Sequence, residues 1–287
     1  MAAQNPVAVT VGTARPGEAV PTLPDEDLAH ARATDPDGTF VARDAEGRVL
    51  GTACAAVRED TLLLLSLDVD AADRGSGVGR MLLAAVRAHG AARGARALEV
   101  LAPDEPAALA FLLHAGLSLR ALVLGMEAVA AAGARDPGTQ GRGGPLSPVG
   151  TGAPLSGWIA ALDRETRGFA RPRDWSRRAA DGHLVSLKRG GRPVALGAWH
   201  EETGAGVRRT ALGPIAAKTP EAAADLLRML AARSPGKRLS LALPAEARAL
   251  LLAAHALGFR AVSTRALLTD RRRGDLRRYA GGGGRLF

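Results

Sequence analysis

The sequence predicts a protein of the α/β class with two domains, and three observations support this prediction. Segments with the apolar pattern of strands alternate with segments of helical pattern in both halves of the chain. A chain of 287 residues is long enough for two cores, and a stretch rich in Gly and Pro divides it. Both halves also end on a similar unit, made of a strand, a proline, a helix, a glycine and a last strand. We therefore predict a first domain at 1–132, a linker at 133–154 and a second domain at 155–287.

Each expected element follows from a local pattern of apolar, turn and capping residues. The first half is expected to contain, in order, strand 7–11, helix 25–33, strands 39–43, 49–57 and 62–69, a helix from 81 to about 93, strand 95–101, helix 105–114 and strand 117–129. The second half is expected to contain helices 155–169 and 172–180, strands 183–188, 192–199 and 207–215, helix 221–232, strand 239–242, helix 245–257 and strand 260–269.

The most informative stretch connects the apolar strand 62–69 to the helix that follows it. Three glycines within five residues, Gly75, Gly77 and Gly79, allow positive φ and expose consecutive backbone N–H groups. A concave row of N–H groups at a helix N-terminus attracts anions, helped by the helix dipole. The expected ligand is therefore a phosphate group, most simply a pyrophosphate.

Several kinds of glycine-rich loop compete for this assignment. A P-loop would end in Gly-Lys-Ser/Thr, whereas Gly79 is followed by Arg80 and Met81. A dinucleotide-binding loop would read G-x-G-x-x-G, whereas the glycines here are spaced by two. A glycine-rich turn without any ligand is the plainest alternative. The remaining pattern is Arg-x-x-Gly-x-Gly, which Arg74, Gly77 and Gly79 satisfy.

This loop after an apolar strand resembles the acyl-CoA pyrophosphate loop of the GNAT N-acetyltransferases, and the element order over 25–129 is similar to a GNAT domain. The resemblance implies an α/β (α+β) protein of two GNAT-like domains, each a mixed central sheet flanked by helices. Further stretches resemble a bacterial tandem GNAT group with a divergent second domain. They are Asp35-Pro-Asp-Gly-Thr-Phe40, Asp163 with Gly168 and Arg171, and Leu212-Gly-Pro214.

The resemblance also implies a site. Acetyl-CoA, or another acyl-CoA, would lie along the free backbone edge of Leu67–Val69 as a co-substrate. The loop that would hold its pyrophosphate comprises Arg74, Gly75, Ser76, Gly77, Val78, Gly79 and Arg80. The candidate catalytic residue is Asp68. Either Asp68 or Asp70 could hold a water chain to the acceptor amine, although an ordinary strand-end carboxylate is the plainer interpretation of each.

The sequence departs from the family pattern at the positions of the usual acid and base. The family's thiolate-protonating tyrosine falls on Leu112, and its frequent glutamate base falls on Leu65 or Leu63. In the second half, the corresponding loop after Leu212 contains Pro214, which has no N–H, and a single glycine. The second domain is therefore expected to bind no acetyl-CoA, and His200 is a weaker candidate for a substrate pocket there.

Composition limits the location and the partners. Cys54 is the only cysteine, which excludes a disulfide within the chain and suits a reducing cytoplasm. We expect no signal peptide, because no basic region precedes an apolar stretch at the start, and no membrane span, because no apolar run reaches about 20 residues. No spacing of His, Cys and carboxylate residues suggests a metal site.

Charge is distributed unevenly along the chain. Residues 1–130 carry 11 Lys and Arg against 17 Asp and Glu, and residues 131–287 carry 27 against 12. The basic second half could bind nucleic acid or an acidic substrate, or dock onto the acidic first half. Nucleic acid is the less favoured partner, because aromatic residues that could stack on bases make up only 3% of the chain.

The leading interpretation is an acetyl-CoA-dependent N-acetyltransferase. It would transfer the acyl group to a primary amine of a small-molecule or protein acceptor, by direct attack in a ternary complex. The alternative is a non-catalytic acyl-CoA sensor or scaffold, suggested by the leucines at the acid and base positions.

Overall fold

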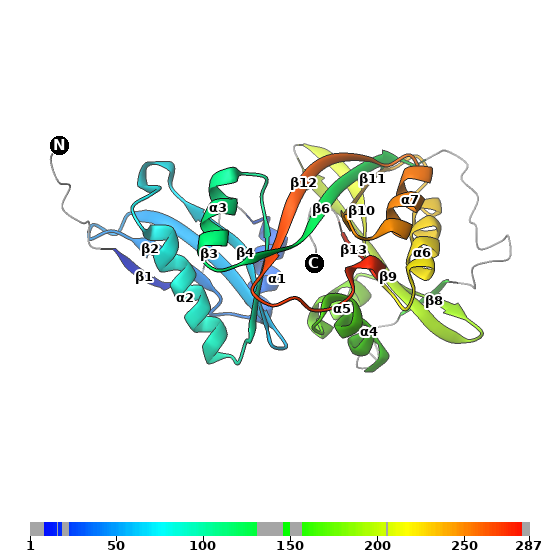
Figure 1. The fold of residues 1–287 in the computed structure, drawn as a ribbon, viewed down its shortest axis with the longest axis horizontal. Coiled ribbons are helices and arrows are strands. Elements are labelled where there is room, and N and C mark those ends of the chain that lie inside the picture. Colours follow the sequence, from blue (N-terminus) through cyan, green and yellow to red (C-terminus); the bar gives the residue numbers. More distant parts are fainter. Residues whose placement is uncertain are drawn as a thin grey trace. The chain divides into compact units, whose positions relative to one another are not determined.

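The structure is a computed structural model that describes residues 9–15, 17–18, 23–130, 146–149, 157–204 and 206–282. The chain divides into two units (Figure 1). The first comprises Met1–Val100 with Thr269–Arg271, and the second comprises Leu101–Leu268 with Arg272–Phe287. These units do not coincide with the domains expected at 1–132 and 155–287, whose boundaries stay a prediction.

The first unit is built on a mixed sheet. Its elements are β1 (Thr10–Thr13), α1 (Asp25–Thr34), β2 (Thr39–Arg43), β3 (Val49–Arg58), β4 (Thr61–Val69), the 3-10 turn η1 (Ala71–Asp73), α2 (Val78–Ala92) and the start of β5 (Ala97–Ala102). The strands lie in the order β1-β2-β3-β4-β5, and every pair is antiparallel except the parallel pair β4–β5. The predicted α/β class with a mixed sheet is thereby confirmed.

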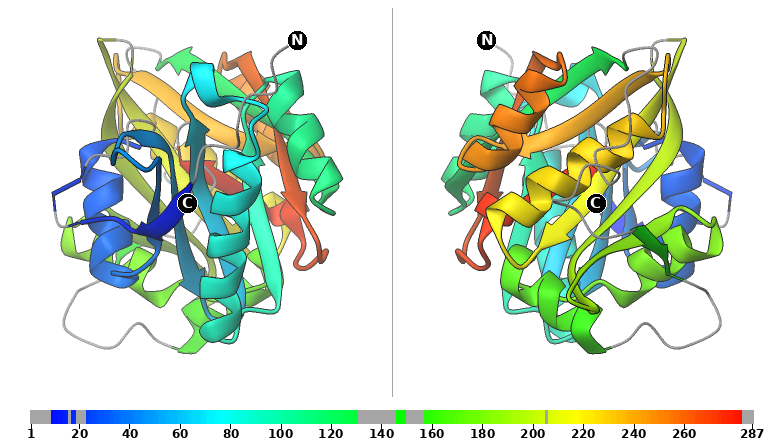
Figure 2. Two further views of the ribbon diagram at one scale, coloured as in Figure 1. Left: turned by 90° about the vertical axis from the view of Figure 1, so that its left-hand side faces the viewer. Right: turned by 90° about the vertical axis from the view of Figure 1, so that its right-hand side faces the viewer.

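Helices α1 and α2 cover opposite faces of this sheet (Figure 2). A Cβ atom on Gly51 of β3 would lie 3.2 Å from Leu82 of α2. Cys54, three residues further along β3, packs instead with Leu28 and Ala31 of α1. Residues three apart on a strand point to opposite faces, so one helix lies on each face.

The second unit contains a larger sheet. Its elements are α3 (Pro106–His114), β6 (Ser118–Val129), β7 (Leu146–Pro148), α4 (Gly157–Arg167), α5 (Pro172–Ala180), β8 (Leu184–Arg189), β9 (Arg192–Gly204), β10 (Val207–Ala217), α6 (Pro220–Ala232), β11 (Arg238–Pro244), α7 (Arg248–Ala256), β12 (Arg260–Thr269), η3 (Leu276–Arg278) and β13 (Tyr279–Gly282). The strand order is β12-β6-β11-β13-β10-β9-β8-β7. Helices α6 and α7, side by side in Figure 2, pack on one face, and α4 and α5 belong to a separate apolar cluster.

Two parts of this sheet differ from what local patterns suggest. The strand expected to close the first domain is β6, and it pairs antiparallel with β11, from Val129 opposite Arg238 to Val123 opposite Pro244. Most of the predicted linker lies outside the described residues, but its residues Leu146–Pro148 form β7, which pairs with β8. Local pattern does not encode which distant strand becomes the partner.

A buried polar cluster stabilises the second unit. The side chains of Asp163 and Arg171 are both 0% exposed and form an ion pair of 2.7 Å. Arg171 Nη1 also donates to the Tyr279 hydroxyl at 3.1 Å. Burial alone would lower the pKa of Arg171, but its interactions with Asp163, Tyr279 and Asp174 together raise that pKa. Gly168 has φ of 93°, and a Cβ there would lie 2.3 Å from Arg273, so the Asp163–Gly168–Arg171 pattern serves packing.

Two searches of the described residues were negative. No helix there is long and apolar enough to cross a membrane. No group of three or more His, Cys, Asp or Glu side chains in those ranges is arranged to hold a metal ion.

Candidate active site

The end of β4 separates from its parallel neighbour. Thr61–Leu64 pairs with Ala97–Val100 of β5, and no further pair between these strands occurs among the described residues. On its other side β4 stays paired with β3 as far as Val69, which lies opposite Gly51. The segment 65–69 is therefore held by β3 on one edge, while its second edge diverges from β5.

A β-bulge starts this divergence. Cys54 of β3 lies opposite Ser66, and the next residue, Ala55, lies opposite Leu64, so Leu65 is the extra residue in β4. A bulge bends its strand and increases the local twist. The free backbone N–H and C=O groups after it are obligatory hydrogen-bonding groups without a strand partner on that edge. Such an edge can accept an extended ligand by strand-like hydrogen bonds.

The loop after β4 is folded by its own polar groups. The Asp70 carboxylate accepts from Ala72 N at 3.2 Å. The Asp73 carbonyl accepts from Ser76 N at 3.3 Å and from the Ser76 hydroxyl at 2.6 Å. Arg74 Nε donates to the Val69 carbonyl at 3.3 Å, which ties the loop back to the strand.

Two glycines then turn the chain into α2. Gly75 and Gly77 have φ of 83° and 99°, values that favour glycine. Gly77 is the N-cap of α2 and brings no side chain to cap it, and the helix begins at Val78 rather than at Met81 as predicted. A Cβ on Gly75 would meet nothing within 4 Å, and one on Gly77 would meet only Arg80 Nη2 at 3.5 Å.

The N-terminus of α2 therefore has the properties of an anion site. The first N–H groups of a helix have no intrahelical acceptor, and the helix dipole makes this end positive. Arg74 and Arg80 are exposed beside it and supply two further positive charges. Room above the glycines, open N–H groups and two guanidiniums together fit a pyrophosphate.

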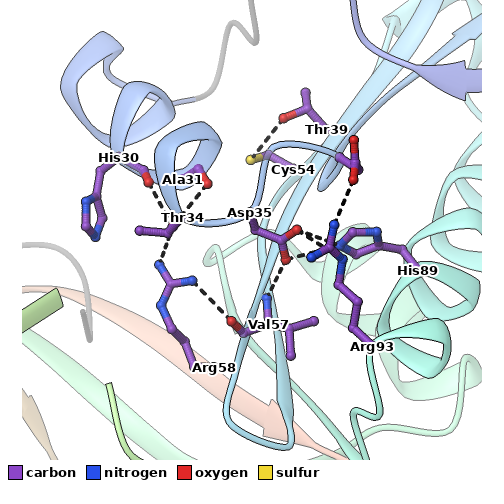
Figure 3. A network of polar contacts seen from close by, with 11 residues as sticks. His30, Ala31, Thr34, Asp35, Thr39, Cys54, Val57, Arg58, His89 and Arg93 are labelled. Atoms are coloured by element: carbon purple, nitrogen blue, oxygen red, sulfur yellow. Dashed lines mark hydrogen bonds and ion pairs between the residues drawn. The ribbon is translucent and has the colours of Figure 1, made fainter. Parts of the chain in front are cut away.

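A buried carboxylate holds the other end of α2 (Figure 3). Asp35, 2% exposed, accepts from His89 Nε2 at 3.0 Å and lies 3.3 Å from Arg93 Nε, both near the end of the helix. The same carboxylate accepts from the backbone N of Val57 in β3 at 2.8 Å. Arg93 also pairs with Asp37 at 2.7 Å. One side chain thus joins the turn before β2, the centre of the sheet and the last turn of α2.

The rest of the Asp35–Phe40 stretch fits tightly against β3. Gly38 accepts from Ala55 N at 2.7 Å, and a Cβ on Gly38 would lie 2.2 Å from the Ala55 carbonyl oxygen. Thr39 Oγ1 lies 3.7 Å from Cys54 Sγ (Figure 3), and burial raises the pKa of that thiol. Cys54 is thus a protonated core residue, in agreement with its apolar surroundings in the sequence.

The structure brings the predicted loop residues together at one place, between the end of β4 and the start of α2. Asp68 is half-buried on β4 opposite Thr52. The leucines at the usual acid and base positions are apolar core: Leu63 is 2% exposed, Leu112 is 5% exposed, and Leu65 packs against the cluster at α1. None of them can move a proton.

One polar residue of β4 escaped sequence reasoning. Ser66 Oγ is buried and has no hydrogen-bond partner among the described residues. Its position is special because it follows the bulge residue Leu65, and a bulge leaves no mark in the apolar pattern.

The predicted role of His200 of the second unit in a substrate pocket stays a prediction. Burial, reinforced by the nearby Arg178 and Arg177, lowers its pKa to about 3. The imidazole is therefore neutral at pH 7. Its Cε1 atom lies 3.0 Å from where a Cβ on Gly282 would be, so it packs against β13.

The corresponding opening in the second unit is closed. Strands β10 and β11 pair in parallel at Thr210 and Ala211 and then separate, and β10 has a bulge after Leu212. Strand β13 lies between them and pairs antiparallel with both (Figure 1). The following helix, α6, is capped by Thr219, whose hydroxyl accepts from Ala222 N at 3.2 Å, and begins with Pro220, which has no N–H.

Comparisons with known families and structures agree with this geometry. Residues 11–117 match the model of the acetyltransferase (GNAT) family, and residues 159–276 match that of an acetyltransferase (GNAT) domain. No curated protein is detectably similar to the chain in sequence.

Solved structures that are similar to nearly the whole chain include the following three. A Pyrococcus horikoshii protein assigned as an acetyltransferase is 14% identical with a TM-score of 0.71, and the match covers 94% of this chain and 92% of that one. A GCN5-related N-acetyltransferase from Sphaerobacter thermophilus is 14% identical with a TM-score of 0.59, covering 93% and 98%. A tandem GNAT protein from the clavulanic acid biosynthesis pathway is 16% identical with a TM-score of 0.57, covering 91% and 98%. These likenesses concern the fold alone. The two family models show that the chain belongs to the GNAT acetyltransferase family and carries two GNAT domains in tandem.

Proposed function

We propose that the chain is an N-acyltransferase that uses acetyl-CoA or another acyl-CoA as co-substrate. The observation that carries this proposal is the continuity of the diverging edge of β4 with the glycine-capped start of α2. The edge at Leu67–Val69 would hold the pantetheine chain by backbone hydrogen bonds. The loop from Arg74 to Arg80 would hold the pyrophosphate.

Bound acetyl-CoA supplies a thioester whose acyl carbon can accept an amine. The backbone N–H groups of β4 would polarise the thioester carbonyl, and Asp68 would face the incoming primary amine. In the transfer a C–N bond forms and the C–S bond breaks, and the proton lost by the amine balances the one that CoA gains as a thiol. Orientation alone can supply roughly 7–11 kcal/mol, whereas one acid or base contributes about 10²–10⁴-fold. Transfer is therefore feasible without the usual tyrosine and glutamate.

The second candidate function is a non-catalytic acyl-CoA sensor. The specific observation in its favour is that Leu63, Leu65 and Leu112 are apolar and packed where the family often carries acid and base groups. Such a protein would bind acyl-CoA tightly and never turn it over.

Calorimetry with acetyl-CoA and a CoA-release assay with a panel of primary amines test both candidates. Binding followed by CoA release supports the enzyme. Binding without release for any small-molecule or peptide amine favours the sensor, and absence of binding overturns both. We expect the protein itself to act in the cytoplasm, because its single, buried cysteine suits a reducing compartment.

A further inference from the structure

A partly buried carboxylate belongs to the loop that is proposed to hold an anion. Asp73 immediately precedes Arg74, and its side chain is only 18% exposed. Its backbone carbonyl accepts from the N–H and the hydroxyl of Ser76, so Asp73 is part of the fold of this loop. A partly buried charge is poorly screened by salt, and a carboxylate repels a phosphate group nearby. The charge of Asp73 therefore opposes anion binding at the start of α2 unless another group compensates it.

Arg48 provides the compensating charge. Its Nη1 atom donates to Asp73 Oδ2 at 3.0 Å, and its Nη2 atom donates to Oδ1 at 3.2 Å. A guanidinium that pairs with a carboxylate through two N–H groups fixes the orientation of both groups as well as offsetting their charges. Within 70–80 two carboxylates offset two guanidiniums, so the segment has no surplus of positive charge of its own. Pairing with Arg48 takes one of these carboxylates out of that balance.

The turn between β2 and β3 holds Arg48 in place. The Asp44 carboxylate, 7% exposed, accepts from Arg48 N at 2.8 Å and from Arg48 Nε at 2.9 Å. Two backbone hydrogen bonds of 3.1 Å close the same turn, from Asp44 N to the Arg48 carbonyl and from Gly47 N to the Asp44 carbonyl. The turn thus fixes one side of the guanidinium, and its other side is left to face the loop.

The ion pair extends the contact between β3 and β4 beyond the two strands. After the last paired residues, Asp70 N donates to the Leu50 carbonyl at 2.9 Å. The pair of Arg48 with Asp73 follows, and it joins residues 25 apart in the chain. The turn before β3 and the loop after β4 are thereby connected by side chains, close to the point where α2 begins.

We propose that Arg48 is a positioning residue for acyl-CoA binding, which compensates the charge of Asp73 and holds the loop in the form that accepts a pyrophosphate. This inference rests on the proposed function, because it names a residue outside the loop on which the affinity of the loop depends. Arg48 acts through Asp73 rather than by touching the ligand. The dependence is the same for the enzyme and for the sensor, since both must bind acyl-CoA.

The chain provides a matched control. Arg189 lies beside the turn between β8 and β9 and pairs with Asp225 of α6, so it also joins a hairpin to a carboxylate further along the chain. Its side chain is 39% exposed, against 54% for Arg48. Arg189→Gln removes an ion pair of the same kind in the second unit, which is expected to bind no acetyl-CoA.

The test measures acetyl-CoA binding to the full-length chain by calorimetry at low and at high salt. At about 20 mM salt we expect Arg48→Gln to bind about five- to tenfold more weakly than the wild type. At about 0.5 M salt the difference should shrink to about twofold or less, because the uncompensated carboxylate is then screened. Arg48→Lys keeps the charge but not the two-pronged contact and should lose less than Arg48→Gln. Arg189→Gln should match the wild type.

A combined variant separates compensation of charge from mere support of the fold. Asp73→Asn removes the carboxylate that Arg48 compensates and leaves the backbone carbonyl that accepts from Ser76. Added to Arg48→Gln, it should therefore bring the affinity at low salt back to within about twofold of the wild type. A variant in which Arg48 only supported the fold would not recover in this way.

The possible failures are distinguishable. If the wild type binds acetyl-CoA and Arg48→Gln binds it equally well, or if the combined variant does not recover or the deficit persists at high salt, the role of Arg48 is wrong and the proposed function stands. If the wild type binds no acetyl-CoA, the proposed function fails and the role of Arg48 with it. Equal thermal unfolding temperatures of the variants confirm that each is folded.

Discussion

In the first unit β4 leaves its parallel neighbour after Leu64, and in the second unit β10 leaves β11 after Ala211. Each strand has a bulge at that point and leads through a loop into a helix. The first opening has no strand within it among the described residues, whereas β13 fills the second. The two units thus share the same diverging pair of strands. In the first unit one strand edge stays unpaired, and in the second unit a strand of the same chain pairs with it.

The helices that follow the two strands, α2 and α6, also differ in how their N-termini are capped. Gly77 starts α2 without a side-chain cap, so its first N–H groups remain available. Thr219 starts α6, and its hydroxyl takes the N–H of Ala222, while Pro220 removes a second donor. In the second unit, backbone groups at the helix start are capped or absent, whereas the corresponding N–H groups of α2 have no side-chain cap.

The largest expected effect concerns the loop of the first unit. Gly77→Asp adds a side chain at φ of 99° and a negative charge at the proposed pyrophosphate site, so acetyl-CoA binding should be lost. Calorimetry on the folded variant measures it, and the wild type should bind one acetyl-CoA per chain. Gly94→Asp is the control, since Gly94 also has positive φ and open space but lies beyond the far end of α2. Unchanged affinity in Gly77→Asp, or two sites per chain, would break the comparison.

The second effect is a loss of folding stability at acid pH in the second unit, where β13 lies between β10 and β11. Folded His200 has a pKa of about 3, against an ordinary 6.5. Between these values the unfolded chain binds one more proton, so stability falls as the pH falls, by up to about 1.4 kcal/mol per pH unit. Denaturant unfolding between about pH 6 and 4 should therefore show a shallower decline for His200→Gln than for the wild type.

An exposed histidine of the same unit provides the reference for that measurement. His255 lies on α7 with an exposed side chain, and His255→Gln is unfolded under the same conditions for comparison. Identical slopes for His200→Gln and the wild type would mean that His200 is not buried as a neutral group.

A third effect probes the contact between β10 and β13. Gly213 has φ of 142°, and a Cβ there would lie 2.5 Å from the Gly281 carbonyl oxygen. Gly213→Ala should lower the free energy of unfolding by about 1–3 kcal/mol, because the strand in the opening must shift. Gly191→Ala, at positive φ but with nothing within 4 Å, measures the backbone strain alone. Equal losses in the two variants would argue against tight filling by β13.

The smallest effect sharpens the contrast between the two helix starts. Thr219→Ala should destabilise the protein by about 1 kcal/mol, the usual effect of losing an N-cap hydrogen bond. It should not create acetyl-CoA binding, since Pro220 and β13 remain. A second binding event in calorimetry of this variant would show that the cap alone separates the two sites.

Local features could be predicted from the sequence, and pairings between distant segments could not. The glycines around Gly77 predict a turn into a helix, because the preference is intrinsic to those residues. The bulge at Leu65 depends on register with β3, and the contact of Asp35 with His89 joins residues 54 apart in the chain. The insertion of β13 could not be predicted from the sequence either, since this short glycine-rich segment has no strand pattern.

Because Asp35 holds only the C-terminal end of α2, a small rotation there moves the N-terminal end of the helix. The 15 residues of α2 extend for about 22 Å, with the contact between Asp35 and His89 near one end and the glycine loop at the other. A tilt of about five degrees around this contact would carry the loop end sideways by about 2 Å, which is most of a hydrogen-bond length. A change at Asp35 would therefore displace the loop that is proposed to hold the pyrophosphate, although no ligand in the loop would touch Asp35 itself.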